Sequence, residues 1–213
     1  MLNELKDYKF ILGSTSPRRL EILANNLGIV DVTVLGSNYP EDLSKEGISK
    51  EEYVQKTSYN KARDILDQLT NGPPISNTVI LTADTIVCCH DAIFEKPKTT
   101  TRQKEMFKQY KNYGTAEVIT AVTAVKLTLD VNNLQVTTER NSVTSTTLTY
   151  NSQLSEEVIS AYIESGEGLS VAGGFKFQEG GSILFSKIDG DYFNVVGLPV
   201  SSTFLLLQDL LRC

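Results

Sequence analysis

A nearly continuous apolar run from Val79 to Cys89 constrains the fold of this chain more than any other segment. A strand of this composition suits the centre of a sheet that is covered on both faces. Asp84 and Thr85 interrupt the run. An ionised carboxylate in such a strand is costly to bury unless it is paired, hydrogen-bonded or bound to a metal. Asp84 is therefore a candidate functional residue, and the alternative is a strand-end carboxylate that accepts backbone N–H groups.

The first apolar strand, residues 10–12, runs into a polar turn and then into a helical pattern. Pro17 suits the first turn of that helix, because its missing N–H would have no partner there. Free N–H groups at a helix start, together with hydroxyls and guanidinium groups, favour phosphate binding. The alternative is an ordinary capped helix with solvated arginines. The candidate phosphate ligands are Ser14, Arg18 and Arg19.

Periodicity and turn residues predict the other elements, and no internal repeat or low-complexity linker divides the chain. We therefore expect a single domain over residues 1–213, in which any lobes are not independent domains. Turn residues at 130–133 lie between two long runs of strand formers, which predicts an antiparallel ribbon. Helices are predicted at 49–69, 100–113, 155–163 and after Pro199, and strands at 30–34, 116–129, 134–150 and 183–185.

Composition narrows the range of partners. The net charge of −6 argues against a nucleic acid polymer or an anionic membrane as the main partner, and leaves a small polyanion possible. Three cysteines do not form a disulfide framework, and no segment has the pattern of a signal peptide or the length of a membrane span. We therefore expect a cytoplasmic protein. The single histidine, His90, argues against a catalytic triad or a histidine-rich zinc site.

Phosphoryl chemistry needs cations around the phosphate oxygens, carboxylates that hold a divalent metal, and a base for the attacking water. The chain offers such groups near predicted strand ends, helix starts and loops, which favours hydrolysis of a nucleotide's phosphate chain. Each has an ordinary alternative, such as a lysine that extends its ammonium into solvent. The cations are Arg18, Arg19, Lys61 and Lys96, and the carboxylates are Glu41, Asp84 and Glu95.

Seven short motifs occur in order along nearly the whole chain. They are Ser14-Thr15-Ser16-Pro17-Arg18-Arg19, Asn60-Lys61-Ala62, Ala83-Asp84-Thr85-Ile86-Val87, Glu95-Lys96-Pro97, Val118-Ile119-Thr120-Ala121-Val122, Ala172-Gly173-Gly174 with Gln178, and Asn194-Val195-Val196-Gly197-Leu198-Pro199. Together they resemble the motifs of the Maf-like nucleoside triphosphate pyrophosphatases. The variants present here look most like the branch that acts on dTTP, UTP and modified pyrimidine triphosphates.

The resemblance implies a two-lobed α/β fold of the inosine-triphosphate-pyrophosphatase-like (Maf-like) type. Such a fold has a long mixed β-sheet flanked by helices and a cleft between the lobes. The resemblance also implies hydrolysis of a nucleoside triphosphate to the monophosphate and pyrophosphate, with Mg²⁺ or Mn²⁺, by a homodimer.

Site residues follow from the same resemblance, motif by motif. Asp84 matches the proton acceptor that activates water. The acidic metal ligand of the family is matched by Glu41, with Asp84 also expected at the metal. Positions tied to substrate choice are matched by Arg19, Thr85 and Gln178, and phosphate-binding positions by Ser14, Arg18, Lys61 and Lys96.

The sequence departs from the family pattern at two places. Glu179 stands where the family often has a glycine, which would let a base or ribose approach closely. Ala116-Glu117 stands where the family has a histidine. The alternative function is therefore a catalytically impaired nucleotide-binding regulatory protein that keeps the phosphate cleft, and a third possibility is a structural or interaction module.

Overall fold

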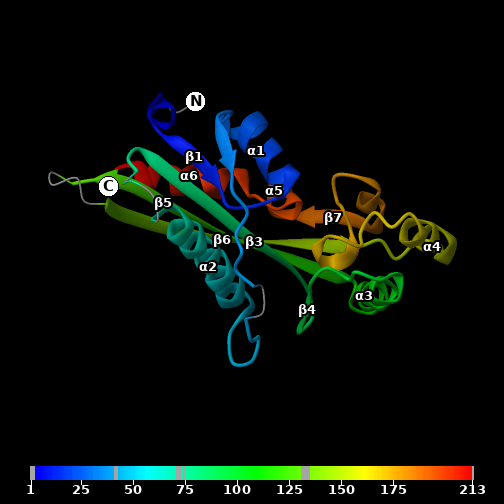
Figure 1. Ribbon diagram of the computed structural model, residues 1–213. Coiled ribbons are helices and arrows are strands. Elements are labelled where there is room, and N and C mark those ends of the chain that lie inside the picture. The colour runs from blue at the N-terminus through cyan, green and yellow to red at the C-terminus, as the bar shows by residue number, and fades with distance from the viewer. Residues whose placement is uncertain (1–2, 41–42, 71–72, 74, 131–134, 213) are drawn as a thin grey trace. The chain divides into compact units, whose positions relative to one another are not determined.

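The computed structural model describes residues 3–40, 43–70, 73, 75–130 and 135–212 (Figure 1). Its strands form one sheet in the order β2-β1-β3-β5-β6-β7, with β4 paired to β3. β1 is parallel to β2 and to β3, whereas β4 is antiparallel to β3 and β7 is antiparallel to β6. The strands are β1 (Lys9–Leu12), β2 (Val32–Val34), β3 (Thr78–Cys89), β4 (Ala92–Phe94), β5 (Thr115–Leu129), β6 (Gln135–Tyr150) and β7 (Phe185–Asp189).

Helices flank this mixed sheet, so the predicted α/β fold class is confirmed. Among the helices in the described ranges, none combines the length and the apolar content needed to cross a membrane. The α-helices are α1 (Pro17–Leu27), α2 (Lys50–Thr70), α3 (Thr100–Tyr113), α4 (Glu156–Glu164), α5 (Tyr192–Val196) and α6 (Val200–Arg212). The short 3₁₀ helices are η1 (Asn3–Asp7), η2 (Ala172–Gly174) and η3 (Gly180–Leu184).

The apolar run from Val79 to Cys89 belongs to the single strand β3, which lies between β1 and β5. Every residue of β3 except Thr85 is buried, as expected for a strand covered on both faces. β5 and β6 are neighbours in the sheet, and both run the length expected from their β-branched residues. The turn predicted at 130–133 falls at 131–133 outside the described residues.

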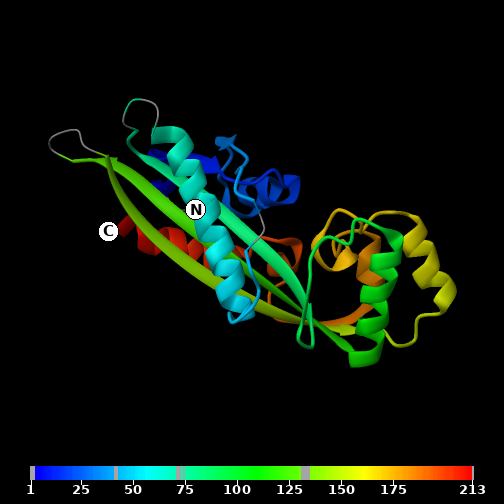
Figure 2. The same ribbon diagram turned by 60° about the horizontal axis from the view of Figure 1, so that its bottom comes forward.

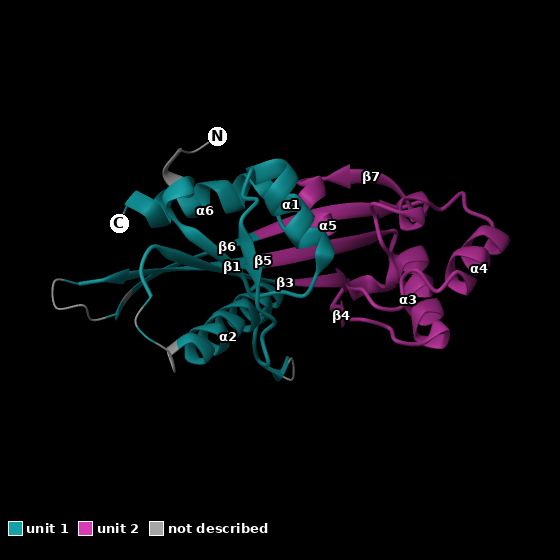
Figure 3. Ribbon diagram, turned by 45° about the horizontal axis from the view of Figure 1, so that its top comes forward, with its two compact units in different colours: residues 1–84, 121–143, 197–213 teal, residues 85–120, 144–196 magenta. Residues whose placement is uncertain are grey.

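The chain forms two compact units, and it crosses from one to the other within β3, β5 and β6 and again between α5 and α6 (Figure 3). Unit 1 comprises residues 1–84, 121–143 and 197–213, and unit 2 comprises residues 85–120 and 144–196. The single domain expected over residues 1–213 therefore stays a prediction.

In unit 1, α2 lies along the long strands of the sheet (Figure 2). Its apolar side chains, Ala62, Ile65 and Leu66, pack with Ile80 of β3 and Val125 of β5 in one buried cluster. The spacing of these helix residues places them on one face. The same face also carries polar side chains toward the sheet, and these form the candidate site.

In unit 2, α3 and α4 pack on an aromatic core that includes Phe107, Tyr110, Tyr162 and Phe175. Tyr110 is fully buried, which raises the pKa of its phenol, and its hydroxyl donates a hydrogen bond of 2.9 Å to the carbonyl of Gly173. This bond ties α3 to η2. The aromatic residues thus fill the core of unit 2 and do not form part of the polar candidate site.

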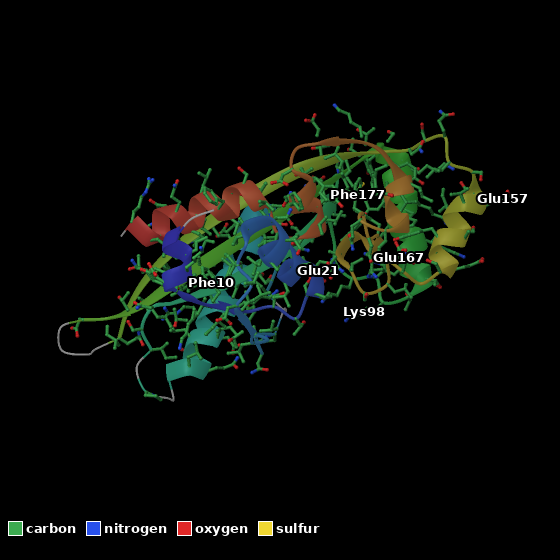
Figure 4. All side chains as sticks on the ribbon, turned by 90° about the horizontal axis from the view of Figure 1, so that it is seen from above. Phe10, Glu21, Lys98, Glu157, Glu167 and Phe177 are labelled. Atoms are coloured by element: carbon green, nitrogen blue, oxygen red, sulfur yellow. The ribbon has the colours of Figure 1, made fainter. Side chains whose placement is uncertain are left out.

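The strand predicted at 183–185 is wrong at both ends, because residues 180–184 form η3 and β7 runs from Phe185 to Asp189. The carboxylate of Glu167, labelled in Figure 4, accepts the backbone N–H groups of Gly180 and Gly181 and fixes the start of η3. Asp191 caps α5 by accepting the backbone N–H groups of residues 193 and 194.

Candidate active site

A buried ion pair joins α2 to β3 in unit 1. The ammonium nitrogen Nζ of Lys61 lies 2.8 Å from Oδ1 of Asp84. Both residues are 8% exposed. Lys61 therefore does not extend its charge into solvent, and Asp84 is more than a carboxylate that accepts backbone N–H groups. Two opposite charges at this distance and depth satisfy the condition under which a carboxylate can be buried.

The turn before α1 contains a second cluster of polar side chains in unit 1. The hydroxyl of Ser14 accepts a hydrogen bond of 3.1 Å from a terminal nitrogen of Arg19 and one of 3.2 Å from the backbone N–H of Ser16. Nε of Arg19 also donates to the carbonyl of Gly197, at 2.8 Å. The guanidinium of Arg19 thus ties the start of α1 to the turn before α6, a role that its predicted part in substrate choice did not include. Arg18 follows Pro17 in α1 and is half-buried.

This tie predicts that Arg19→Lys lowers the stability of the protein in the absence of any nucleotide. An ammonium cannot reproduce the two directed bonds of a guanidinium. Hydrogen bonds of charged groups contribute about 1.5–3 kcal/mol each, and lysine can still donate one of the two bonds, so we expect a loss of roughly 1.5–3 kcal/mol. Urea unfolding measures it, with Arg18→Lys on the same helical turn as the control. Equal stability of the two variants would contradict the proposed tie.

The turn before α1 is also anchored to β3, the strand that carries Asp84. The backbone N–H of Gly13 donates to the carbonyl of Leu81, at 2.8 Å. A Cβ atom on Gly13 would lie 2.5 Å from the methyl carbon of Thr82, so only glycine allows this approach. Ser14 therefore begins its turn beside Thr82, two residues before Asp84 along β3.

The remaining predicted substrate residues belong to unit 2. Thr85 is half-buried, and its hydroxyl lies 2.9 Å from that of Thr120, which donates to the backbone carbonyl of Asn194 at 3.3 Å. Gln178 donates its amide to Glu179, at 3.3 Å. Lys96 is exposed just after β4. Asn194 is fully buried and donates its amide to the carbonyl of Val118 and the hydroxyl of Thr146, both at 2.9 Å.

Asp64 contributes to unit 1 although no motif pointed to it. Its carboxylate accepts the backbone N–H of Asn38 at 2.7 Å, the hydroxyl of Ser37 at 2.9 Å and the amide of Gln68 at 2.9 Å. Burial raises the pKa of Asp64, but the hydrogen bonds together outweigh burial and the net pKa is lowered. Asp64 thus holds the loop that leads toward residue 41 against α2.

The lowered pKa of Asp64 gives a pH-dependent prediction. A carboxyl group with a depressed pKa in the folded state stabilises the protein above its unfolded value of about 4, and this contribution is lost as the pH falls through the folded value. We therefore expect the stability difference between wild type and Asp64→Asn to be constant above about pH 5 and to shrink below it. Urea unfolding at several pH values measures the difference. A difference that stays the same at about pH 3 would contradict the assignment.

The predicted metal ligands are only partly among the described residues. No group of three or more histidine, cysteine, aspartate or glutamate side chains suited to a metal occurs in the part of the chain that the structure describes. Glu41, the predicted metal ligand, lies outside the described residues. Mg²⁺ is often held by one or two carboxylates together with substrate phosphates, so the single carboxylate of Asp84 is compatible with an Mg²⁺ site.

Sequence and structure comparisons relate this chain to known proteins. A family model described as Maf-like protein matches residues 9–210. A dTTP/UTP pyrophosphatase from Saccharomyces cerevisiae is 39% identical over 92% of this chain and 88% of its own length. A dTTP/UTP pyrophosphatase from Thermoanaerobacter sp. is 37% identical over 94% of this chain and 95% of its own length. A solved HAM1 protein from Coxiella burnetii is 11% identical, with a TM-score of 0.48 over 95% of this chain and 99% of that chain.

The family match covers nearly the whole chain, and relatives with more than a third of their residues identical cover most of it as well. Both units contain residues from the matched region. The chain therefore belongs to the family of Maf-like proteins.

Proposed function

We propose that this protein hydrolyses dTTP and UTP to the nucleoside monophosphate and pyrophosphate. The relatives named dTTP/UTP pyrophosphatase support the substrate class. The observation that carries the proposal for the chemistry is the buried pair of Lys61 and Asp84. An ionisable pair is costly to bury, and replacing one by apolar residues is often neutral or stabilising. Its presence in an otherwise apolar strand therefore favours a functional role.

In the proposed reaction a water oxygen attacks the α-phosphorus and Asp84 takes the proton that this water loses. The bond from the α-phosphorus to the bridging oxygen breaks, and that oxygen leaves with pyrophosphate. Lys61 supplies the positive countercharge beside Asp84. Arg18 and the free N–H groups at the start of α1 would bind phosphate oxygens, because a helix N-terminus favours anions. Among the ways in which enzymes accelerate reactions, stabilisation of developing charge by such groups usually contributes most.

A divalent ion belongs to the same proposal. Bound Mg²⁺ or Mn²⁺ would neutralise phosphate charge and polarise the phosphoryl oxygens. Asp84 would hold it together with oxygens of the substrate, and Glu41 is the predicted second carboxylate. We also propose a homodimer, for which light scattering should give twice the chain mass of 23.5 kDa.

A screen of nucleoside triphosphates tests the proposed activity. Each nucleotide is incubated with the protein and Mg²⁺ or Mn²⁺, and phosphate is measured with and without added inorganic pyrophosphatase. We expect phosphate from dTTP and UTP only when the coupling enzyme is present, because the direct product is pyrophosphate. Phosphate release without the coupling enzyme would contradict the proposal.

The second candidate function is a nucleotide-binding regulatory protein without turnover. Glu179 favours it, because this carboxylate contacts the ammonium of Lys176 at 3.2 Å and the amide of Gln178 at 3.3 Å. Those contacts occupy the amide that is predicted to take part in substrate choice. Calorimetry that detects dTTP binding, with no product formed in Mn²⁺, would support this function over the first.

A further inference from the structure

Three buried hydroxyl groups connect α2, β3 and β5 within unit 1. Ser58, Thr82 and Thr123 are each 0% exposed. The hydroxyl of Thr82 donates to the backbone carbonyl of Ser58, at 2.8 Å. The hydroxyl of Ser58 lies 3.0 Å from that of Thr123, to which it donates. A buried hydrogen-bond network specifies one packing arrangement when every polar group in it has a hydrogen-bond partner. Each of these hydroxyls has one.

The hydroxyls of Ser58 and Thr82 share a face with the Lys61–Asp84 pair. Ser58 and Lys61 are three residues apart on α2, so they lie on the same side of the helix. Thr82 and Asp84 are two residues apart on β3, so they point to the same face of the sheet. The contacts of Ser58 with Thr82 and of Lys61 with Asp84 are therefore two successive links between one helix and one strand.

Thr82 also contacts the turn that carries Ser14. The space for a side chain on Gly13 is filled by the methyl group of Thr82, at 2.5 Å from an ideal Cβ position. The residue after Gly13 is Ser14, whose hydroxyl is bonded to Arg19. Thr82 of β3 thus contacts two other segments that carry predicted site residues, the turn before α1 and α2.

The hydroxyl bonds add a directional constraint to the apolar packing of α2 on β3. The hydrophobic effect is non-directional, so the packed side chains Ala62, Ile65 and Leu66 restrict the helix through their shape alone. A hydrogen bond between Thr82 and Ser58 has a defined length and direction. A displacement of about 1 Å in a reacting group can lower a rate by roughly 10²-fold.

We propose that Thr82 and Ser58 are positioning residues for the reaction, which hold α2 at the register that places Lys61 against Asp84. This inference rests on the proposed pyrophosphatase function for its kinetic test. The positioning of Lys61 by Thr82 and Ser58 does not depend on that function, because the ion pair and the hydroxyl bonds are both in unit 1.

The kinetic test compares Thr82→Val, which removes the hydroxyl at nearly constant volume, with Thr82→Ser, which keeps it. We expect Thr82→Val to lower kcat for dTTP by about tenfold or more with KM changed by less than about threefold. Thr82→Ser should keep most of the wild-type kcat. Ser58→Ala should repeat the effect of Thr82→Val.

Thr57→Val is the matched control. Thr57 is 1% exposed on the same helix, but its hydroxyl donates only within that helix, to the carbonyl of Tyr53 at 2.9 Å. We expect Thr57→Val to lower stability without lowering kcat. If Thr57→Val and Thr82→Val lower kcat equally, or if Thr82→Val keeps the wild-type kcat, the positioning role is refuted.

A double-mutant cycle in urea tests the same inference without any activity. Thr82→Val and Lys61→Met are combined, and we expect their effects on the unfolding equilibrium to deviate from additivity by at least about threefold, because both act on one helix-strand register. Additive effects would overturn the inference. If wild type releases no pyrophosphate, the proposed function fails, while this cycle still decides whether Thr82 positions Lys61.

Discussion

Asp84→Asn is expected to lower the turnover of dTTP by about 10²-fold or more, the scale on which removal of a general base acts. Asparagine has nearly the same shape as aspartate and can still accept a hydrogen bond from the ammonium of Lys61, which lies 2.8 Å from the carboxylate. It cannot accept a proton from water. The coupled assay measures this change as the rate of pyrophosphate release.

The fold of this variant must be intact for the result to count. A circular dichroism spectrum and a melting curve close to those of wild type would establish that. Asp91→Asn serves as the control, because Asp91 is an exposed carboxylate that pairs with His90 at 2.7 Å. We expect it to keep wild-type turnover. Normal turnover by Asp84→Asn would refute the assignment of Asp84 as the base.

Lys61→Met is expected to have the largest effect on stability. Methionine fills much of the space of the lysine stem but leaves the carboxylate of Asp84 buried without its counterion. Removing one member of a buried pair costs about 3–5 kcal/mol. Since the two side chains are only 10% and 12% exposed, solvent screens little of this cost. The melting temperature should fall by roughly 10 °C, because about 1 kcal/mol shifts it by 2–4 °C in a chain of this size.

The double variant Lys61→Met/Asp84→Asn separates stability from activity. With both charges removed no unpaired ion is buried, so we expect most of the lost stability to return while turnover stays low. Differential scanning calorimetry and the coupled assay measure the two quantities. A Lys61→Met variant as stable as wild type would show that the ion pair is not a buried interaction in solution.

The central strand was predictable because its signal is local. The apolar run from Val79 to Cys89 can be buried on both faces, and the structure forms β3 over Thr78–Cys89. Helix α3 was also predicted with correct ends, since Thr99 caps its start and Gly114 adopts a left-handed conformation at its end. Asp84 was identified because a carboxylate conflicts with the composition around it.

Other features depend on contacts that the local sequence does not encode. Ser58 and Thr82 are 24 residues apart, and Ser58 and Thr123 are 65 apart, so their hydroxyl bonds follow from the packing of α2 on the sheet. Threonine in a strand is ordinary, and nothing distinguishes Thr82 from its neighbours before the helix is in place. Asp64 was missed for the same reason, because two of its three partners lie in a loop 26 and 27 residues earlier.

The motifs predicted several site residues individually but not the residues that each contacts in the folded protein. Lys61 and Asp84 form a pair, as do Ser14 and Arg19. The bond from Arg19 to the carbonyl of Gly197 crosses 178 residues of sequence and had no local signal. Asn194 belongs to a predicted motif, yet its role in joining Val118 and Thr146 became visible only in the folded unit.

The fate of oxygen from water during turnover tests most directly whether water attacks the α-phosphorus with Asp84 as the base. dTTP is hydrolysed in water enriched in a heavy oxygen isotope, and the monophosphate and pyrophosphate are separated and analysed by mass spectrometry. Attack on the α-phosphorus, with Asp84 taking the proton, predicts that the heavy oxygen enters the monophosphate and that Asp84→Asn forms this labelled product about 10²-fold more slowly. Label in the pyrophosphate, or equally fast labelling by the variant, would contradict this mechanism.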